Sequence, residues 1–480
     1  FRDIAVTCSG LTLTTVTQTL GITHNDTGES PANYRFTCSP DIRLNALPVL
    51  GDAPFLVVNG DIWTDFDFAT LPREPRGQAH LVLVDNPVQH ADGDYRLDTQ
   101  GVLHHDREGP CLTYAGIGVY RPSIVADWRT VIGEAPGSER NWDYRYCWIR
   151  DSYYTIQALN RLGALDVLEK YLGFLRNVVA NASDGDIQPL YSVMGEGRLD
   201  ERIAPDLAGY QGTGPVRVGN AAYLQRQYDC YGQIVLPSAH AFFDRRLLRM
   251  SDAGDFASLE EVGEMAWKMH DQPDAGLWEF RTRTEVHTYS AVMSWAACQR
   301  LANVARELDL ADRFALWAER ADAIRTTIEA RVWVDGPDGG HYKASFESDY
   351  LDASLLQLAE VRYIAAEDPK FQSTLRAVES ELRRGEHMLR YAAEDDFGTP
   401  ETAFNVCTFW LIEALHLARR DDEARALFER MLDHSTSSGL LSEDMDFETG
   451  ELWGNFPQTY SLVGVINCAV LLSRSWNTIR

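Results

Sequence analysis

Residues 141–151 read Asn-Trp-Asp-Tyr-Arg-Tyr-Cys-Trp-Ile-Arg-Asp, the densest cluster of aromatic and charged residues in the chain. Within it, the guanidinium of Arg150 donates hydrogen bonds in a fixed fork and the adjacent carboxylate of Asp151 accepts them, so the pair can hold several hydroxyls of one sugar. The indoles of Trp142 and Trp148 can stack on sugar faces. A helix N-terminus capped by Asp151, with the tryptophans in the core, is a second interpretation that is compatible with the first.

From this stretch to the C-terminus, apolar residues recur with the period of an α-helix. The pattern predicts eleven helices, at 152–162, 165–180, 221–246, 256–270, 287–308, 311–333, 350–362, 369–384, 402–419, 422–434 and 461–476. A closed double ring of paired helices needs an even number, so eleven indicates that one partner is missing. The nearest upstream candidate, 127–131, is short.

The connections between the predicted helices alternate in length and composition. Short polar links, which join antiparallel neighbours, lie at 161–166, 307–311, 363–368 and 419–422. Long connections that gather Trp, Tyr, Asp, Glu and Arg lie at 191–220, 276–287, 336–349, 392–402 and 439–460. A ring of helical hairpins places all the long connections on one face, where we expect the chemistry.

Glu279 lies in Gly276-Leu277-Trp278-Glu279-Phe280, between two aromatic residues in a loop that leads into a helix. Apolar rings raise the pKa of a carboxyl and let it act as a general acid. A loop glutamate placed near a helix start by the helix dipole is the simpler alternative, and for an isolated glutamate it is the more frequent one.

Glu443 lies in Leu440-Leu441-Ser442-Glu443-Asp444, followed by the polar loop 449–458. We expect its polar neighbours to keep the carboxylate ionised, as a general base requires. If Glu279 and Glu443 face each other across the ring, a gap of about 6.5–9.5 Å leaves room for an attacking water and gives inversion. A solvated acidic loop is the alternative that spacing alone favours.

The loop 209–220, which contains Arg217 and Asn220, is rich in glycine and is expected to line the same mouth. It matches no trusted phosphate-binding pattern. No cofactor is expected, which is what the family resemblance given below implies.

Composition limits the partners. The 480 residues carry 44 Lys and Arg against 71 Asp and Glu, a net charge of -27, which disfavours nucleic acid and anionic membranes. A neutral sugar such as an α-glucan or oligosaccharide suits this field. Eight scattered cysteines without a CxxC pair indicate no metal cluster and favour reduced thiols in a cytoplasm. The longest apolar run, 463–472, is too short to span a bilayer, and the first residues do not read as a signal peptide.

The first 140 residues follow a different pattern. Residues 1–45 read as irregular or poorly ordered, 46–126 as part of an α/β sheet, and 127–140 as a linker to the helical domain 141–480. The apolar run Phe55-Leu56-Val57-Val58 followed by Asn59-Gly60-Asp61 predicts a parallel strand with Asp61 at its carboxyl end, where open α/β sheets bind ligands.

Five segments together resemble glycoside hydrolase family 15, the bacterial glucoamylase and trehalase group: 141–151, 209–220, 277–279, 352–356 and 441–458. Over residues 134–480 the resemblance implies a mainly α (α/α)6 toroid, here without its first helix, and inverting release of β-glucose from non-reducing ends. It implies that Glu279 is the general acid and Glu443 the general base. It also assigns the glucose ring to Arg150 and Asp151, and the cleft lining to Trp142, Trp148, Trp278, Arg217 and Asn220.

This resemblance leaves several activities open. A glucoamylase-type exo-α-glucosidase is the first expectation, and an α,α-trehalase or a glucodextranase are near alternatives. A third possibility is a helical scaffold without activity, because the β-sandwich and first helix that precede the barrel in bacterial relatives are not recognisable here.

Residues 46–122 resemble the middle of a sugar-1-phosphate nucleotidyltransferase of the N-acetylmuramate-1-phosphate uridylyltransferase type, through Leu47-Pro48-Val49-Leu50-Gly51, the segment 55–63 and the segment 115–122. The resemblance makes Asp61 one of two acidic Mg²⁺ ligands. The glycine-rich loop and the second acidic ligand are absent from the pattern, so an inactive fragment is expected, and nucleotidyl transfer is the competing function.

Overall fold

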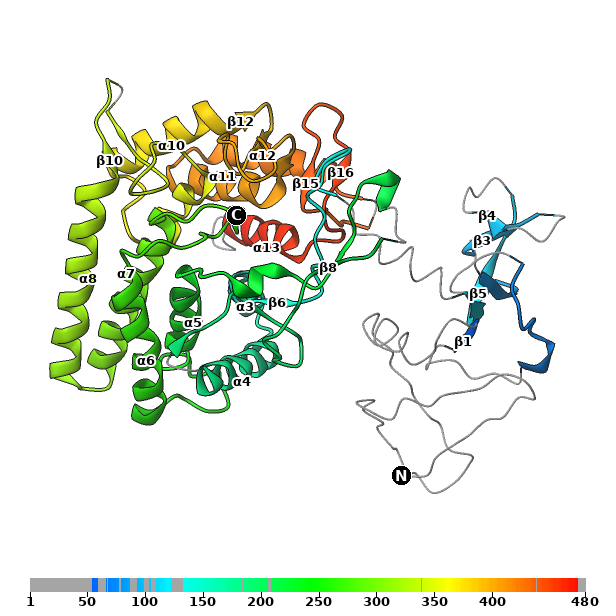
Figure 1. The fold of residues 1–480 in the computed structure, drawn as a ribbon, viewed down its shortest axis with the longest axis horizontal. Coiled ribbons are helices and arrows are strands. Elements are labelled where there is room, and N and C mark those ends of the chain that lie inside the picture. Colours follow the sequence, from blue (N-terminus) through cyan, green and yellow to red (C-terminus); the bar gives the residue numbers. More distant parts are fainter. Residues whose placement is uncertain are drawn as a thin grey trace, which may run out of the picture. The chain divides into compact units, whose positions relative to one another are not determined.

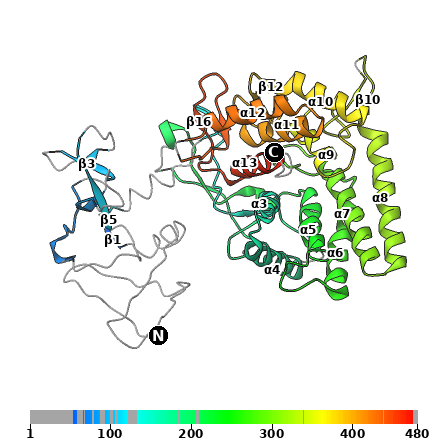
Figure 2. The ribbon, with the colours of Figure 1, turned by 180° about the vertical axis from the view of Figure 1, so that it is seen from behind.

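The computed structural model describes residues 54–58, 66, 68–76, 79–86, 93–98, 103–104, 109–121, 133–182, 185–205, 209–337, 339–436 and 438–473. The chain divides into two compact units, residues 1–130 and 131–480. The second unit is helical and carries the site (Figures 1 and 2).

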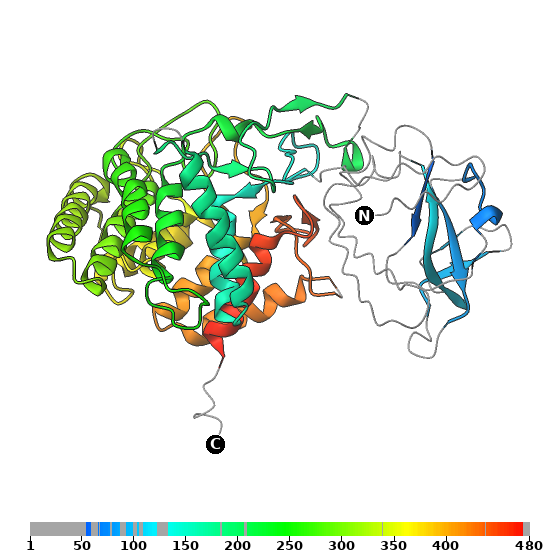
Figure 3. The same cartoon turned by 90° about the horizontal axis from the view of Figure 1, so that it is seen from below.

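An inner ring of helices forms the centre of the helical unit. Its members are α3 (Ile149–Arg161), α5 (Asp229–His240), α7 (Thr288–Glu307), the short pair η6 (Ala353–Leu356) and α9 (Gln357–Glu360), α11 (Asn405–Leu417) and α13 (Thr459–Leu472). Each member contacts the next, and α13 contacts α3, so the inner ring closes. In Figure 3, seen from below, the red helix α13 lies beside the teal helices at the start of the helical unit, and α13 contacts α3.

An outer layer covers the inner ring. It consists of α4 (Leu165–Asn181), α6 (Ala253–Met269), α8 (Ala311–Val332), α10 (Pro369–Leu382) and α12 (Asp421–Asp433). The described part of the helical unit thus holds eleven α-helices, as the periodicity predicts, and forms an (α/α)6 toroid. The junction between α13 and α3 carries no outer helix among the described residues, which locates the missing partner.

Glycines allow the inner helices to pack closely. A Cβ on Gly232 of α5 would lie 2.5 Å from the carbonyl oxygen of Met293 on α7, and a Cβ on Gly464 of α13 would lie 2.3 Å from the ring of Phe409 on α11. Real Cβ atoms do not approach other atoms so closely, so larger residues at either position would force these helices apart.

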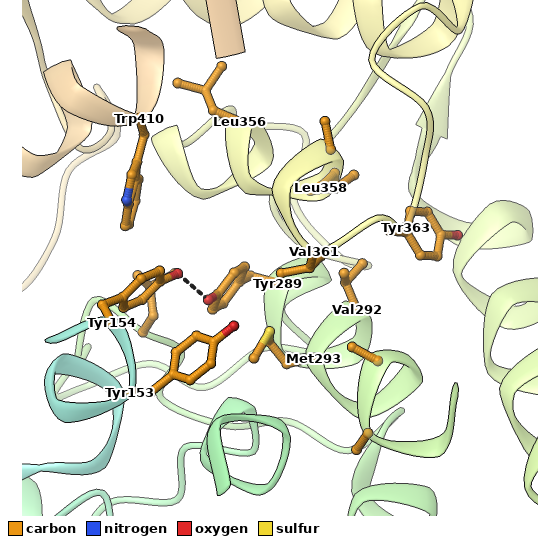
Figure 4. Close-up of a cluster of buried hydrophobic side chains, with 14 of the residues drawn as sticks. Tyr153, Tyr154, Tyr289, Val292, Met293, Leu356, Leu358, Val361, Tyr363 and Trp410 are labelled. Atoms are coloured by element: carbon orange, nitrogen blue, oxygen red, sulfur yellow. Dashed lines mark hydrogen bonds between the residues drawn. The ribbon is translucent and has the colours of Figure 1, made fainter. Parts of the chain in front are cut away.

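The centre of the ring contains hydroxyl groups as well as apolar side chains. Tyr154 of α3 and Tyr289 of α7 are hydrogen-bonded through their phenol oxygens at 2.5 Å (Figure 4). Tyr153 and Trp410 pack against Tyr154, with ring centroids 5.0 and 6.0 Å away. Buried phenols need partners, and this pair satisfies that need directly beneath the site.

Helix ends follow local sequence signals. Asp252 caps α6 by accepting from the backbone N–H groups of Gly254 and Asp255, and Asp368 caps α10, which has Pro369 at its first position. The predicted helix at 221–246 is shorter than expected: a 3-10 turn, η5 (Ala221–Leu224), precedes α5. Asn220 caps that turn by accepting from Ala222 N–H, so the chain turns before α5 begins.

Short antiparallel strand pairs lie in the connections between helices. They are β6 (Cys147–Trp148) with β7 (Leu190–Tyr191), β8 (Arg202–Ile203) with β9 (Arg217–Val218), β10 (Trp333–Val334) with β11 (His341–Tyr342), β12 (Arg383–Arg384) with β13 (His387–Met388), and β14 (Ala403–Phe404) with β15 (Asp444–Met445) and β16 (Leu452–Trp453). These pairs fix the loops that surround the site.

The N-terminal unit contains a sheet built on the long strand β5 (Cys111–Tyr120). It pairs with β1 (Phe55–Val58), β2 (Ala79–Val84) and β3 (Tyr95–Leu97), and β4 (Leu103–His104) pairs with β3. Every pairing described in this sheet is antiparallel, so β1 pairs with β5 in the antiparallel direction and not in parallel as predicted. An apolar run is also compatible with an antiparallel strand, and residues of β5 such as Ile117 and Val119 are themselves buried. Asp61 lies outside the described residues.

Candidate active site

One cavity in the helical unit brings together most of the residues that the sequence singles out. It is lined by Glu134, Arg140, Trp142, Tyr144, Trp148, Arg150, Asp151, Asn220, Ala222, Gln225, Leu277, Trp278, Glu279, Phe280, Arg281, Arg390, Tyr391, Asp395, Asp396, Phe397, Phe404, Glu443 and Tyr460. Glu279 and Glu443 are far apart in sequence and line the same space. The predicted connection 336–349 contributes no lining residue, whereas 390–404 contributes six.

The Arg150-Asp151 pair lies in the first turn of α3 and lines the cavity. Arg150 donates from Nη1 to the carbonyl of Leu277 at 2.5 Å and contacts Asp151 at 3.0 Å and Glu279 at 3.4 Å through Nη2. Burial alone would lower the pKa of Arg150, but the charges of Asp151 and Glu279 outweigh it and raise the pKa. The Arg150 guanidinium is therefore a permanent cation that contacts both Asp151 and Glu279. We call Arg150 and Asp151 together the clamp.

Glu279 lies in the loop between α6 and α7, closed at its base by the bridge between Asp274 and Glu285. Its backbone has φ of 61°, a left-handed conformation that non-glycine residues rarely adopt and that occurs at functional sites. The indole Nε1 of Trp148 donates to its Oε1 at 2.7 Å, and 24% of its side chain is exposed. Its carboxylate is thus held by polar donors, not enclosed by apolar rings as the sequence suggested.

Trp278, next to Glu279, is fixed separately. Its Nε1 donates to Oδ2 of Asp352 at 2.7 Å, and its ring packs on Phe404 and Trp410. Asp352 itself accepts from the N–H and hydroxyl of Ser354. This chain of contacts orients the loop that carries Glu279.

Glu443 lines the same cavity, immediately before β15, and is 5% exposed. It accepts from the backbone N–H of Asn455 and from Nε2 of Gln458, both at 3.3 Å, and shares the cavity wall with Tyr144. Burial, followed by the negative charge of Glu134, raises the pKa of Glu443. Polar neighbours were expected to keep this carboxylate ionised; in the structure, burial and the charge of Glu134 act against those donors.

Glu134, Tyr144 and Arg390 complete the Glu443 side, and sequence reasoning did not select them. Arg390 Nη2 donates to Oε2 of Glu134 at 2.5 Å, and Trp142 Nε1 donates to Oε1 at 3.0 Å. Glu134 follows Gly133 in a segment of Pro, Gly and Ser, which read as a linker. The structure groups residues 131–140 with the helical unit.

Trp142, Arg217 and Asn220 have structural partners. The guanidiniums of Arg217 and Arg281 lie over the indole of Trp142, with their central carbons 4.4 and 4.1 Å from its ring centroid. Arg217 also donates to the carbonyl of Glu139 at 2.8 Å and does not line the cavity. Asn220 lines the cavity, but its side chain caps η5.

The loop 395–398 lines the cavity through Asp395, Asp396 and Phe397, and its two adjacent aspartates are both held by hydrogen bonds. Arg140 donates to both oxygens of Asp395 at 2.6 and 2.7 Å, and these side chains are 9% and 4% exposed. Asp396 accepts from the backbone N–H groups of Arg281 and Thr282 at 2.5 and 3.0 Å. Through Asp396, this loop is therefore hydrogen-bonded to the loop that carries Glu279. We call residues 395–398 the clamped loop.

Two further properties concern the described residues as a whole. No group of three or more His, Cys, Asp or Glu side chains among them is arranged to hold a metal ion, and their six cysteines are free. None of the described helices has the length and apolar character needed to cross a membrane.

Residues 120–470 match the model of the family described as glycosyl hydrolases family 15. The chain belongs to this family. It is 35% identical over 368 residues to a trehalase of Thermoplasma volcanium, an alignment that covers 74% of this chain and 56% of the relative. The chain thus spans little more than half the length of this curated relative.

Two other similarities concern the fold and the N-terminal unit. A bacterial glucoamylase solved with acarbose matches with a TM-score of 0.53 and 16% identity, covering 68% of this chain and 49% of the other, which supports the fold. An N-acetylmuramate alpha-1-phosphate uridylyltransferase of Neisseria meningitidis serogroup B is 45% identical over 87 residues, covering 16% of this chain and 37% of the relative. The resemblance to a nucleotidyltransferase is therefore confirmed, and it covers only part of such an enzyme.

Proposed function

We propose that the helical unit is an inverting, exo-acting α-glucosidase whose preferred substrate is α,α-trehalose. The observation that carries the proposal is that two glutamates, Glu279 and Glu443, line one cavity together with the Arg150-Asp151 clamp. A glycosidic bond cleaved with inversion needs one carboxylic acid and one carboxylate, and a clamp that holds a single terminal sugar makes the attack exo.

The residues act in sequence. Arg150 and Asp151 hold the hydroxyls of the terminal glucose. Glu279 gives a proton to the glycosidic oxygen, and the bond between that oxygen and the anomeric carbon breaks. Glu443 takes a proton from a water whose oxygen forms the new bond to the anomeric carbon from the other face, so β-glucose is released and both carboxyl groups exchange protonation states.

Two arguments favour trehalose over longer glucans. Curated relatives with 31–36% identity carry the name trehalase, whereas the relative named glucoamylase is 23% identical. The clamped loop also limits the space for a leaving group, because its two aspartates are bonded to Arg140 and to the loop 279–282. A glucoamylase-type activity on α-1,4-glucans is the second candidate, favoured by the general exo geometry of the clamp.

The test uses the full chain with trehalose, maltose, isomaltose and maltoheptaose. Initial rates and the anomer first released are followed by ¹H NMR. We expect trehalose to have the highest kcat/KM and to give equal initial amounts of β-glucose, from the attacked sugar, and α-glucose, from the leaving sugar. A maltoheptaose rate above that of trehalose would select the second candidate, and release of α-glucose alone would overturn the inverting mechanism.

A further inference from the structure

Glu134 is an acidic residue of the cavity for which the mechanism above has no role. Its side chain is 6% exposed, and each carboxylate oxygen has one fixed donor: Trp142 Nε1 to Oε1 at 3.0 Å and Arg390 Nη2 to Oε2 at 2.5 Å. An ionised carboxylate accepts about four hydrogen bonds, so lone pairs remain after these two contacts. Glu134 is therefore a held anion and not a mobile surface residue.

The backbone of Glu134 is anchored to the same region as Glu443. Its N–H donates to the carbonyl of Arg140 at 2.9 Å, and its own carbonyl accepts from the hydroxyl of Thr402 at 3.0 Å. That hydroxyl also contacts Oδ1 of Asp444, the neighbour of Glu443, at 3.0 Å. Backbone bonds at both ends thus keep the Glu134 carboxylate in the wall beside Glu443.

Few other charged groups face Glu443. The groups that affect its pKa come from four places in the chain. Glu134 lies at the start of the helical unit and Tyr144 in the segment before α3. Arg390 lies in the connection before β14, and Asp444 is the next residue in the chain. Asp444 is itself buried, and burial raises its pKa well above the usual range. Among these groups, Glu134 is the carboxyl that is ion-paired with Arg390.

We propose that Glu134 is a positioning residue for the base: its held negative charge strengthens Glu443 as a proton acceptor towards the attacking water. This inference rests on the proposed role of Glu443. A nearby anion disfavours the ionised form of a carboxyl, so the proton taken from water is held more firmly, and base efficiency rises with the pKa of the acceptor. Arg390 is ion-paired with Glu134 at 2.5 Å in this buried position.

A titration that needs no substrate tests the charge effect. Infrared difference spectra across pH report the carbonyl band of protonated carboxyls, and the Glu443 component is identified by its loss in Glu443→Gln. In the wild type its midpoint should lie well above the ordinary value of about 4.3. In Glu134→Gln the midpoint should fall by about one pH unit or more, and in Glu134→Asp, which keeps the charge, it should stay near the wild-type value.

A matched control is available elsewhere in the chain. Glu260 accepts from Trp317 Nε1 and Arg313 Nε, both at 2.6 Å, so it forms the same Trp-Glu-Arg arrangement on α6 and α8. Glu260→Gln should leave the Glu443 midpoint unchanged. A wild-type midpoint near 4.3, or an equal shift in both glutamine variants, would overturn the proposal.

Kinetics separate a positioning role from a structural one. With any glucoside that the wild type hydrolyses, Glu134→Gln should lower kcat about tenfold with little change in KM, and the acidic limb of the pH profile should move to lower pH. The same loss should occur with α-glucosyl fluoride, because the water still needs its base. If the wild type cleaves no glucoside, the proposed function fails, while the infrared titration still decides whether Glu134 acts on Glu443.

Discussion

The two sides of the cavity hold their glutamates in opposite ways. Glu279 is partly exposed, lies on a loop with a left-handed backbone, and is held by the indole of Trp148 and the guanidinium of Arg150. Glu443 is buried beside a strand, receives weaker contacts at 3.3 Å, and has another carboxylate, Glu134, near it. Glu279 thus contacts polar and charged donors, whereas Glu443 is largely shielded from water.

The difference suggests a division of roles that depends on the substrate. Without substrate, Glu279 is near bulk water and a fixed cation, and a sugar entering the cavity replaces that water. Glu443 is already desolvated, so its raised pKa is a property of the protein itself. The surroundings of Glu443 are therefore set by the fold alone, whereas those of Glu279 change when a substrate enters.

The largest expected effect is that of Glu443→Gln. Loss of the base should reduce kcat by about 100- to 10,000-fold on trehalose. The reduction should be equally large on α-glucosyl fluoride, because attack by water needs the base whatever the leaving group. Glucose and fluoride release measured on the two substrates would contradict the assignment if the fluoride were hydrolysed at the wild-type rate.

Glu279→Gln should lose a similar factor on trehalose but little on α-glucosyl fluoride. Fluoride departs without a proton, so the general acid is dispensable for that substrate. The ratio of the two kcat/KM values is the measurement. Equal losses on both substrates would show that Glu279 does not act as the acid, and the contrast between the two sides would disappear.

Opening the clamped loop should change the choice of substrate. In Asp396→Ala the N–H groups of Arg281 and Thr282 lose their acceptor, and hydrogen bonds to a charged group contribute about 1.5–3 kcal/mol. We expect kcat/KM for maltoheptaose relative to trehalose to rise about tenfold. Asp446→Ala removes an aspartate that likewise accepts two backbone N–H groups, from Glu448 and Thr449, but does not line the cavity, and this ratio should not change.

The smallest effects should come from two matched phenylalanine substitutions. Tyr144→Phe removes one donor from Glu443, and Trp148→Phe removes one from Glu279. Each should reduce kcat on trehalose by about tenfold or less. Only Tyr144→Phe should also slow α-glucosyl fluoride hydrolysis. Identical substrate profiles for the two variants would mean that these donors do not serve separate catalytic groups.

Helical periodicity predicted most of the toroid correctly, including eleven helices, because each amphipathic segment buries its apolar face whatever its neighbours are. Predictions from local sequence patterns were wrong where contacts between residues far apart in the sequence decide the structure. The segment 131–140 reads as a linker, yet Glu134 and Arg140 are buried because Arg390 and Asp395, some 250 residues later, pair with them. The apolar run of β1 could not specify which direction its partner would take.

The sequence by itself determined the family, the helical class and the pair of glutamates, since these rest on residue types in a fixed order. Only the tertiary structure decided how the two glutamates differ. Whether a carboxyl is desolvated, and which charge lies beside it, depends on groups that fold in from other parts of the chain: Trp148 and Arg150 for Glu279, and Glu134 and Arg390 for Glu443. The spacing of residues along the sequence does not show which of them come into contact in the folded protein.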